Sequence, residues 1–486
     1  MATLTSCNTA SLAPYVPSTA VPWNIDRVRH VSRRLGYGKT AAIENIWLTM
    51  SPTALVEQVI TDAENVAPYP TPTWGNWTGA DYTDFITERN DQIRELWVGA
   101  SEELLSTGLK GKLTMFWLNH FVVQYASFVA PTYMWKFYKM VQENALGNFK
   151  DFVRAVGTEE AMLRYLNGAQ NRKQAPNENY ARELYELFTL GEDIGYTQTD
   201  ITETARALTG YNSFTQPYPG TVIFNQYNTW DDQPKTIFGQ TGNWDYDDVI
   251  DILFAQRAPQ IAMFITEKLY RFFVSPELPN FQIIAVLAAQ FETNWDIAAL
   301  LRTMLKSEHF FDQNAIGCQI KSPFDLSHQF INEMAIAPDI VPDFSLIVLY
   351  HNANLGQDLF DPIDVAGWQG DYEWINSGIL PYRFQYQEYI MWSIWNWNED
   401  HYRNWLQTIT PEQSDEVVIV KAIVDRFIPR GLYTQSDYDI AVNVFKAPVS
   451  DYYFDNDLYS IFFQETNYQI VLLLQHLFKQ PEFQLN

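Results

Sequence analysis

Apolar residues recur at helical spacing along most of this chain, and this period excludes most fold classes. Between residues 40 and 62 they fall on one face of two short helices, separated at 51–54. Ser51 and Pro52 are residue types that favour a helix start. The same period returns in 108–128, 132–146, 147–167, 177–191, 199–210, 247–273, 281–289, 296–310, 324–336 and 467–479. The sequence therefore predicts a mainly α-helical fold.

One segment departs from the helical period. Residues 211–245 are rich in turn formers and contain two short β-type runs, 221–224 and 236–239, which predict a loop with a small hairpin. Residues 340–385 are also irregular, since Gly and Pro punctuate them. The predicted organisation is an extended segment 1–26, a single large helical core domain 27–400 that contains the 211–245 insertion, and a C-terminal helical extension 401–486.

Composition narrows the function classes. The chain has 486 residues, and its 32 basic and 58 acidic side chains leave a net charge of −26, which disfavours broad binding of nucleic acid. No apolar run reaches the roughly 18 residues of a membrane span. The first 18 residues lack the basic and apolar regions of a secretory signal. We therefore expect neither nucleic-acid partners nor a transmembrane span, and the oligomeric state is left open.

Aromatic side chains are unusually abundant, at 15% of the residues. Aromatic faces stack on sugar rings and fill binding clefts, but they also pack against each other in cores. The densest stretch, 390–405, contains Trp392, Trp395, Trp397 and Trp405. Two interpretations stay open for it, a packed aromatic core or a platform at the rim of a cleft.

The segment 177–191 carries the densest polar cluster on a predicted helix. At 100° per residue, Glu178, Arg182 and Glu186 fall within about 80° of one another, with Glu183 about 60° further round. A solvated, salt-bridged face produces this pattern, and so does an acid–base pair or a carboxylate-rich metal site.

The next predicted helix, 199–210, carries a similar cluster of charged residues: Asp200, Glu203 and Arg206. We expect the 177–191 helix to lie in the interior, because apolar and aromatic residues cover the rest of its circumference. Buried charges persist only when they are paired, so Arg182 is predicted to contact a carboxylate of the 199–210 helix, with Glu203 the expected partner.

Two further clusters lie nearer the N-terminus. Asn119 and His120 stand among aromatic and aliphatic neighbours, where a histidine is either hydrogen-bonded, a metal ligand or a proton carrier. We expect His120 to reach the pocket beside the 177–191 helix. Residues 27–34 contain four arginines, which either pair with the surplus acids or bind an anionic group bidentately.

Several blocks of this sequence resemble one known bacterial family, and they follow the family's order over about residues 27–385. These blocks are 30-HVSRRLGYG-38, 111-GKLTMFWLNHF-121, 145-ALGNFKDFVRAV-156, 176-PNENYARELYELFTLG-191, 195-GYTQTDITETARALTGY-211, 267-EKLYRFFV-274, 321-KSPFDL-326 and 355-LGQDLFDPIDVAGWQG-370. On these motifs the chain is similar to the family of unknown function DUF1800.

The resemblance implies kinship of fold more than a function, because no activity is established for that family. Its members are often exported and often encoded beside a sulfatase-like protein, which implies an extracytoplasmic location and work on environmental or cell-surface polymers. The family often places a His-Asp pair before the lysine of the insertion loop. This chain has Asp231 where that histidine is expected, ahead of Lys235, so a metal site there would be altered.

The leading functional hypothesis is a hydrolase-type enzyme acting on a glycan or another polar polymer. Its predicted catalytic residues are Glu178, Glu183, Glu186 and His120. Its predicted substrate-binding residues are Arg182, Arg206, Asn119, Lys235 and Trp368. Nucleotide-binding and serine-hydrolase motifs are absent. The alternatives are a non-catalytic binding or scaffold protein and a metalloprotein.

The metalloprotein alternative rests on three candidate ligands of a divalent cation, His120, Glu178 and Glu183. Cysteine cannot supply such a site. The two cysteines, Cys7 and Cys318, allow a single disulfide but not a cysteine-based zinc site.

Overall fold

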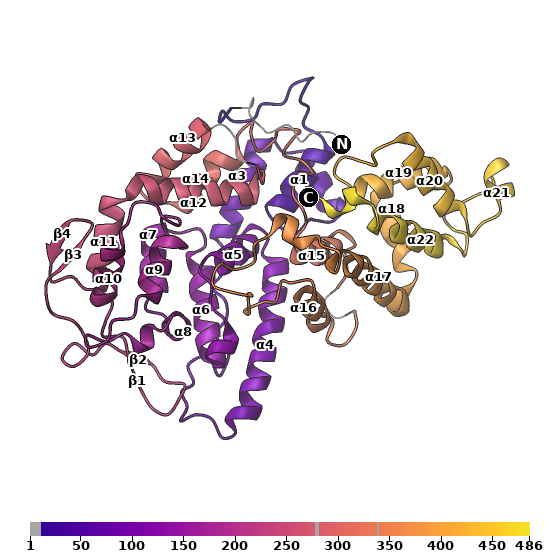
Figure 1. The fold of residues 1–486 in the computed structure, drawn as a ribbon. Coiled ribbons are helices and arrows are strands. Elements are labelled where there is room, and N and C mark those ends of the chain that lie inside the picture. The colour runs from indigo at the N-terminus through magenta and orange to yellow at the C-terminus, as the bar shows by residue number, and fades with distance from the viewer. Residues whose placement is uncertain (1–10, 278–280, 338–339) are drawn as a thin grey trace.

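The computed structural model describes residues 11–277, 281–337 and 340–486. Figure 1 shows helices throughout the molecule, with two small β-hairpins at one edge. The predicted mainly α-helical fold is confirmed. No single helix in these described ranges is long and apolar enough to cross a membrane. The pair Tyr246–Gln256 (α11) and Ala258–Phe273 (α12), bent by 86°, passes that test only when both helices are taken together.

The helices before the hairpins are Ile25–Arg34 (α1), Ala41–Leu48 (α2), Pro52–Glu64 (α3), Phe85–Ser106 (α4), Leu109–His120 (α5), Pro131–Asn144 (α6), Phe149–Val156 (α7), Glu160–Tyr165 (α8), Asn179–Glu186 (α9) and Gln198–Ala207 (α10). Those after the hairpins are Tyr246–Gln256 (α11), Ala258–Phe273 (α12), Phe281–Glu292 (α13), Ile297–Leu305 (α14), Pro323–Glu333 (α15), Phe344–Asn354 (α16), Ile379–Asn398 (α17), His401–Ile409 (α18), Glu416–Phe427 (α19), Gln435–Lys446 (α20), Asp451–Asp455 (α21) and Thr466–Phe478 (α22). Short 3₁₀ helices are Tyr125–Ser127 (η1), Gly168–Gln170 (η2), Asp371–Trp374 (η3) and Pro481–Gln484 (η4).

Local signals placed several helix ends correctly. The Ser51 hydroxyl accepts a hydrogen bond from the Ala54 amide at 3.3 Å, and Pro52 opens α3, as the sequence predicted. α9 is shorter than the predicted 177–191 helix, since it ends at Glu186. The prediction of irregular structure over 340–385 missed α16, which buries Phe344 and Val348.

The 211–245 insertion contains two hairpins instead of the single one predicted. Ser213–Phe214 (β1) pairs with Val222–Ile223 (β2), and Lys235–Ile237 (β3) pairs with Gln240–Gly242 (β4), both antiparallel. The two β-type runs therefore belong to separate sheets. Each run finds its partner nearby in sequence, because β3 turns back through the tight turn at Phe238 and Gly239, both at positive φ.

Buried apolar side chains form two clusters. The first consists mainly of buried apolar side chains from the region between α1 and α14, together with Leu359, Phe360, Trp368 and Trp374. The second runs from Leu326 in α15 to the C-terminal helices, and it includes side chains of both α17 and α18. The predicted boundary at residue 400 therefore lies within the second cluster. In the aromatic stretch, Trp405 is buried in that cluster and Trp397 is 46% exposed.

The arginines of α1 form structural pairs. Arg33 binds both carboxylate oxygens of Glu333, with Nε at 2.8 Å and Nη2 at 3.2 Å. Arg426 of α19 pairs with Glu44 of α2, and its Nε lies 3.7 Å from Glu333. These four side chains are buried, so the network ties both apolar clusters together. Cys318 is buried as a free thiol, and Cys7, with which the sequence allowed a disulfide, falls outside the described residues.

Candidate functional site

The charges of α9 pair within their own helix. Arg182 Nη2 lies 3.1 Å from Glu178, and Nη1 lies 3.3 Å from Glu186. The predicted Arg182–Glu203 contact is wrong, because Glu203 is held by Arg206 one turn along α10, at 2.9 Å. α9 instead meets α10 through neutral groups: the Thr202 hydroxyl donates to Glu178 at 2.8 Å, and Arg182 donates to Gln198.

These α9 charges are partly exposed, with 37% of the Arg182 side chain and 34% of Glu178 open to solvent. The hydrogen bond from Thr202 is the largest cause that lowers the Glu178 pKa. Glu183 differs, since it has no ion pair within the part of the chain that the structure describes. Burial, followed by the charge of Glu186, raises its pKa. α9 therefore presents a half-solvated ion-pair face with one unpaired glutamate.

His120 lies in the interior, enclosed by aromatic rings that include Phe116, Phe121 and Phe188. Its Nε2 donates to the Phe188 carbonyl oxygen at 3.0 Å, which leaves Nδ1 as an acceptor. Burial, then the nearby charge of Lys268, holds the His120 pKa well below its usual value. His120 thus reaches the segment after α9, as expected, but through the backbone, and it stays a neutral imidazole.

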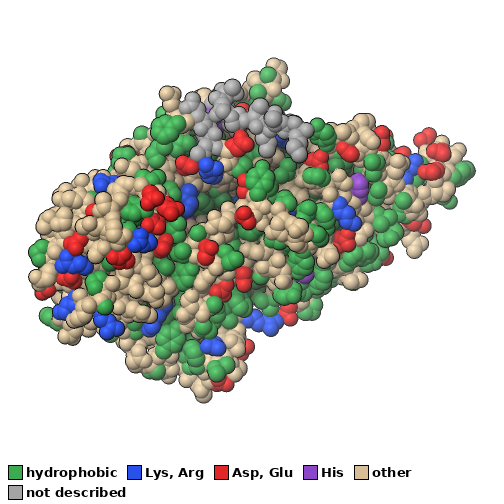
Figure 2. Space-filling view, viewed as in Figure 1, with side chains coloured by type: hydrophobic (Ala, Val, Ile, Leu, Met, Phe, Trp, Pro, Cys, Tyr) green, Lys and Arg blue, Asp and Glu red, His purple; other side chains and the backbone are tan. Residues whose placement is uncertain are grey.

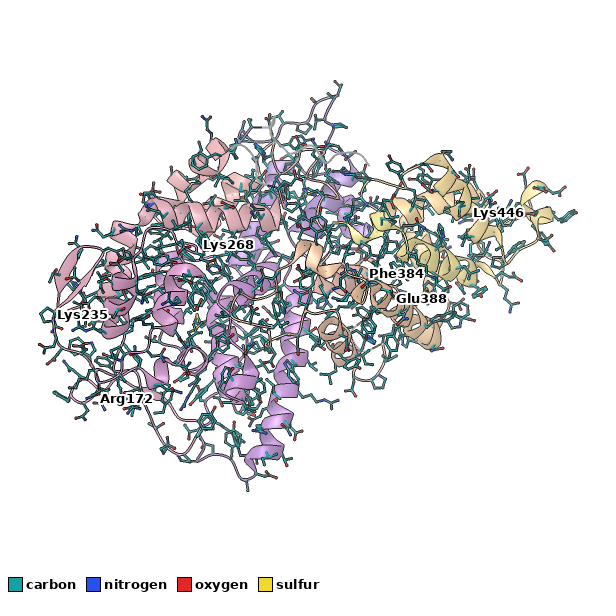
Figure 3. All side chains as sticks on the ribbon, viewed as in Figure 1. Arg172, Lys235, Lys268, Phe384, Glu388 and Lys446 are labelled. Carbon is teal, nitrogen blue, oxygen red and sulfur yellow. The ribbon has the colours of Figure 1, made fainter. Side chains whose placement is uncertain are left out.

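The acceptor nitrogen of His120 binds Lys268 of α12. The Lys268 Nζ lies 3.0 Å from Nδ1 and 4.9 Å from the centre of the Phe264 ring. No carboxylate pairs with Lys268 among the residues described. Burial lowers its pKa to about 8. Figure 3 places Lys268 near the middle of the molecule, on α12 where that helix passes α5.

Lys268 lines a cleft of about 450 Å³, a volume within the range typical of small-molecule sites. Its walls come from α5, α12, the start of α15 and the segment 368–374. The lining combines aromatic rings with amides and charges: Tyr37, Lys112, Met115, Phe116, Asn119, Lys268, Arg271, Phe272, Pro276, Gln319, Ile320, Ser322, Asp325, Gln357, Trp368, Gln369, Gly370, Asp371 and Trp374.

Two predicted substrate-binding residues, Asn119 and Trp368, meet in this cleft. The Asn119 side chain accepts from the Trp368 amide at 2.6 Å and donates to the Trp368 carbonyl at 3.0 Å. These bonds use the Asn119 amide to hold the Trp368 segment. The indole N–H of Trp368 is buried and has no acceptor among the residues described, so it is an unsatisfied donor in the cleft wall.

The other wall carries an ion pair between Lys112 of α5 and Asp325 of α15. The ammonium of Lys112 also lies 4.5 Å from the Tyr37 ring centre. The remaining Asp325 oxygen accepts from Ser322 at 2.9 Å, in the capping box that starts α15. Burial raises the Asp325 pKa, but the stronger combined effect of Lys112 and Ser322 lowers it overall.

Asp371 is the second carboxylate of the cleft. Burial raises its pKa, while the charge of Arg271 works in the opposite direction. The two cleft carboxylates therefore differ: Asp325 is held ionised by Lys112, and Asp371 takes up a proton more readily. Environments that move two pKa values apart are typical of acid–base sites.

The remaining predicted residues, Arg206 and Lys235, lie away from the cleft. Arg206 Nε donates to Asp231 at 2.8 Å, and Lys235 donates to the Asp231 carbonyl oxygen at 2.5 Å. Figure 3 shows Lys235 at the outer edge of the molecule, far from Lys268. Burial raises the Asp231 pKa, but its bonds to Arg206 and Gln233 give a net lowering. Asp231 thus anchors the hairpin as an ion-pair partner.

The metal hypothesis finds no matching arrangement. No group of three or more histidine, cysteine or acidic side chains suited to a cation occurs within the described ranges. His120 has both nitrogens engaged, and Glu178 is bound by Arg182 and Thr202, so the proposed ligands His120, Glu178 and Glu183 do not converge.

Sequence reasoning missed Lys112, Lys268, Asp325 and Asp371. The first three fall inside the motif blocks 111–121, 267–274 and 321–326, and Asp371 directly follows 355–370. The presence of a charged residue within a motif block was the signal that could have identified these three residues. The contacts themselves join residues 148 and 213 positions apart, which helical period does not predict.

We expect Gly367→Ala to destabilise the protein by about 2–3 kcal/mol and to loosen Trp368. Gly367 has φ 79°, and a Cβ there would overlap the Asn119 side chain and carbonyl oxygen. Gly239→Ala is the matched control, because its φ is 77° but a Cβ there would meet nothing within 4 Å. Urea unfolding measures both, and equal losses in the two variants would refute the role given to the Asn119–Trp368 contact.

The family comparison agrees with the motif blocks. A family described as "Protein of unknown function (DUF1800)" matches residues 30–485. No curated protein and no solved structure matches the chain. Because the match extends over nearly the whole sequence, this protein belongs to the DUF1800 family.

Proposed function

We propose that this protein is a hydrolase-type enzyme that acts on a polar, glycan-like substrate bound in the cleft between α5 and α12. The observation that carries the proposal is the combination of indole rings, amides and an unpaired amine in one cleft of about 450 Å³. Sugars are bound in proteins by aromatic faces together with directed polar groups.

Two tryptophans give the cleft its affinity in this proposal. Trp368 and Trp374 supply indole rings to the cleft wall. Asn119 acts as a positioning residue, since its amide is bonded to the Trp368 backbone. Gln369 adds an exposed amide at the opening.

Proton transfer falls to Asp371 and Lys268. Asp371, whose pKa is raised by burial, donates a proton to the leaving oxygen. Lys268, with a pKa of about 8, is neutral in about a tenth of molecules at pH 7 and takes a proton from the attacking water. His120 holds the Lys268 nitrogen in place.

We expect Lys268→Met to reduce turnover of an oligosaccharide panel by at least about 100-fold, a size typical of a lost acid–base group. Lys421→Met is the matched control, because Lys421 is an exposed lysine paired with Asp425 within α19. Product release followed by chromatography gives the readout, and unfolding midpoints of each variant report on folding. Full turnover by folded Lys268→Met would contradict the assignment.

The glutamates of α9 are the alternative catalytic residues. The variant Glu183→Gln distinguishes an active site on α9 from one in the cleft. Glu183 is outside the cleft lining. If the cleft holds the reacting bond, Glu183→Gln retains turnover. Loss of turnover in Glu183→Gln but not in Lys268→Met would move the active site to α9.

A non-catalytic binding protein is the second candidate. The state of Asp325 favours this candidate. Lys112 donates to one of its oxygens and Ser322 to the other, so this carboxylate is not free to act as a nucleophile. Retention of an oligosaccharide on immobilised protein without any product would support this candidate, and light scattering would then show whether ligand drives assembly.

A further inference from the structure

Lys268 is unlike the other lysine of the same cleft. Lys112 is neutralised by Asp325, whereas the only partners of the Lys268 ammonium among the described residues are the imidazole of His120 at 3.0 Å and the face of Phe264. An ammonium without a counter-ion in an enclosed site is costly, and the cost falls when the group gives up its proton.

The neutral amine is a nucleophile. Burial lowers the Lys268 pKa to about 8, so about a tenth of the side chains carry a free lone pair at pH 7. An ordinary lysine, with a pKa near 10.5, carries roughly one in three thousand. Desolvated lysines of this kind are those that attack carbonyl carbons in proteins.

We infer that Lys268 forms a covalent imine with the aldehyde or ketone group of a small hydroxylated compound bound in the cleft. The Nζ lone pair attacks the carbonyl carbon, and a proton moves from nitrogen to oxygen to give a carbinolamine. Loss of one water, made from that hydroxyl and the second amine proton, leaves the C=N bond. No oxidant or reductant enters the step.

The surroundings of Lys268 suit this chemistry. The Nδ1 lone pair of His120 accepts from Nζ and fixes its direction, so His120 is a positioning residue. Phe116 and Phe272 line the cleft and limit the water that would hydrolyse the imine. Gln369 and Asp371 also line the cleft and can form hydrogen bonds with ligand hydroxyls. Open-chain sugars and their short analogues combine a carbonyl with such hydroxyls.

The test uses glyceraldehyde as the probe and the wild-type protein, reduced with sodium borohydride and digested for mass spectrometry. Hydride adds to the imine carbon and fixes the adduct as a secondary amine. At pH 7 we expect Lys268 to be labelled at least about tenfold faster than exposed Lys421 in the same sample. Labelling of Lys268 no faster than Lys421 would overturn the inference.

Two controls make the result specific. Lys268→Arg keeps the charge but removes the nucleophile, so label at that position must vanish. Lys479→Met removes an exposed lysine outside the cleft, so labelling of Lys268 must persist in that variant. The readout needs no glycan turnover. Labelling with no hydrolysis would therefore reject only the proposed hydrolase, and hydrolysis without labelling would reject only the imine.

The pH profile adds a readout that a structural lysine would not give. The labelling rate should rise about tenfold per unit below pH 8 and level off above it, following the free amine. The other titratable or charged groups facing the cleft or Lys268 are Tyr37, His120, Lys112, Arg271, Asp325 and Asp371. A flat profile between pH 6 and 8 would contradict attack by the neutral amine.

Discussion

Replacing Glu333 by Gln should lower the free energy of unfolding by about 3–5 kcal/mol, the usual cost of leaving buried charges unpaired. Glu333 is 1% exposed and receives Arg33 on both oxygens, with Arg426 3.7 Å away. Glutamine keeps the size of the side chain, so the loss measures charge and hydrogen bonding. Arg33 would then lose its carboxylate partner, and Arg426 would keep only Glu44, which it already shares with Arg29.

Urea unfolding at pH 7 provides the measurement, and Glu267→Gln provides the matched control. Glu267 pairs with Arg271 at 3.3 Å, but both side chains are more than a third exposed. Exposed pairs contribute about 0–1 kcal/mol. If Glu333→Gln cost no more than Glu267→Gln, the network would not hold the two apolar clusters together.

A second large effect is expected at Lys321, which should make the protein more stable as the pH rises from 7 to 9. Lys321 is 2% exposed, and its Nζ donates to the Phe483 carbonyl oxygen at 2.8 Å. Burial, followed by the charge of Arg33, lowers its pKa to about 7. Between that value and the pKa near 10.5 of an unfolded chain, the unfolded state binds one more proton.

The sign follows from this proton difference. Because the unfolded state holds the extra proton, raising the pH favours the folded state by up to about 1.4 kcal/mol per unit through this window, and the contribution is absent below pH 7. Lys321→Met removes it, so wild type minus variant stability should rise by about 2–3 kcal/mol between pH 7 and 9. Lys268 contributes a similar pH dependence, but both proteins contain it, so it cancels when the stability of the variant is subtracted from that of the wild type.

The measurement is a series of urea unfolding curves at pH 7, 8 and 9. Lys479→Met is the control, because Lys479 is 55% exposed and pairs with Glu388 on α17. Parallel pH dependences for wild type and Lys321→Met would show that the Lys321 ammonium is not desolvated in the folded protein.

Local features of this fold followed from local sequence. The Ser51 cap, the helical period and the turn-rich insertion depend on residues a few positions apart, and each appears in the structure. The insertion was predicted as one hairpin because its two β-type runs looked like partners. Pairing depends on turn geometry, which the spacing of the runs does not contain.

Only some residues of the cleft could be predicted from the sequence. Asn119 and Trp368 were chosen for their residue types, and both line it. Lys268 was missed because a lysine becomes reactive only through its surroundings, and those come from α5, 148 residues earlier. The Arg182–Glu203 expectation was wrong for a related reason: Arg206, three positions along the same helix, binds Glu203 first. Helical period identifies faces, but not which faces meet.

The cleft lies on the seam between the two apolar clusters, and this position has a thermodynamic consequence. Lys112 stands on a helix of the first cluster, and Asp325 starts the helix that opens the second. In Figure 2, hydrophobic, acidic and basic side chains are mixed over the visible face of the molecule. A molecule that contacts both walls binds only when the two apolar clusters are packed against each other. Its binding free energy therefore adds to the free energy that holds the clusters together. At 100 times its Kd that addition is about 2.7 kcal/mol. Ligand binding in the cleft and packing of the two apolar clusters against each other are therefore coupled equilibria.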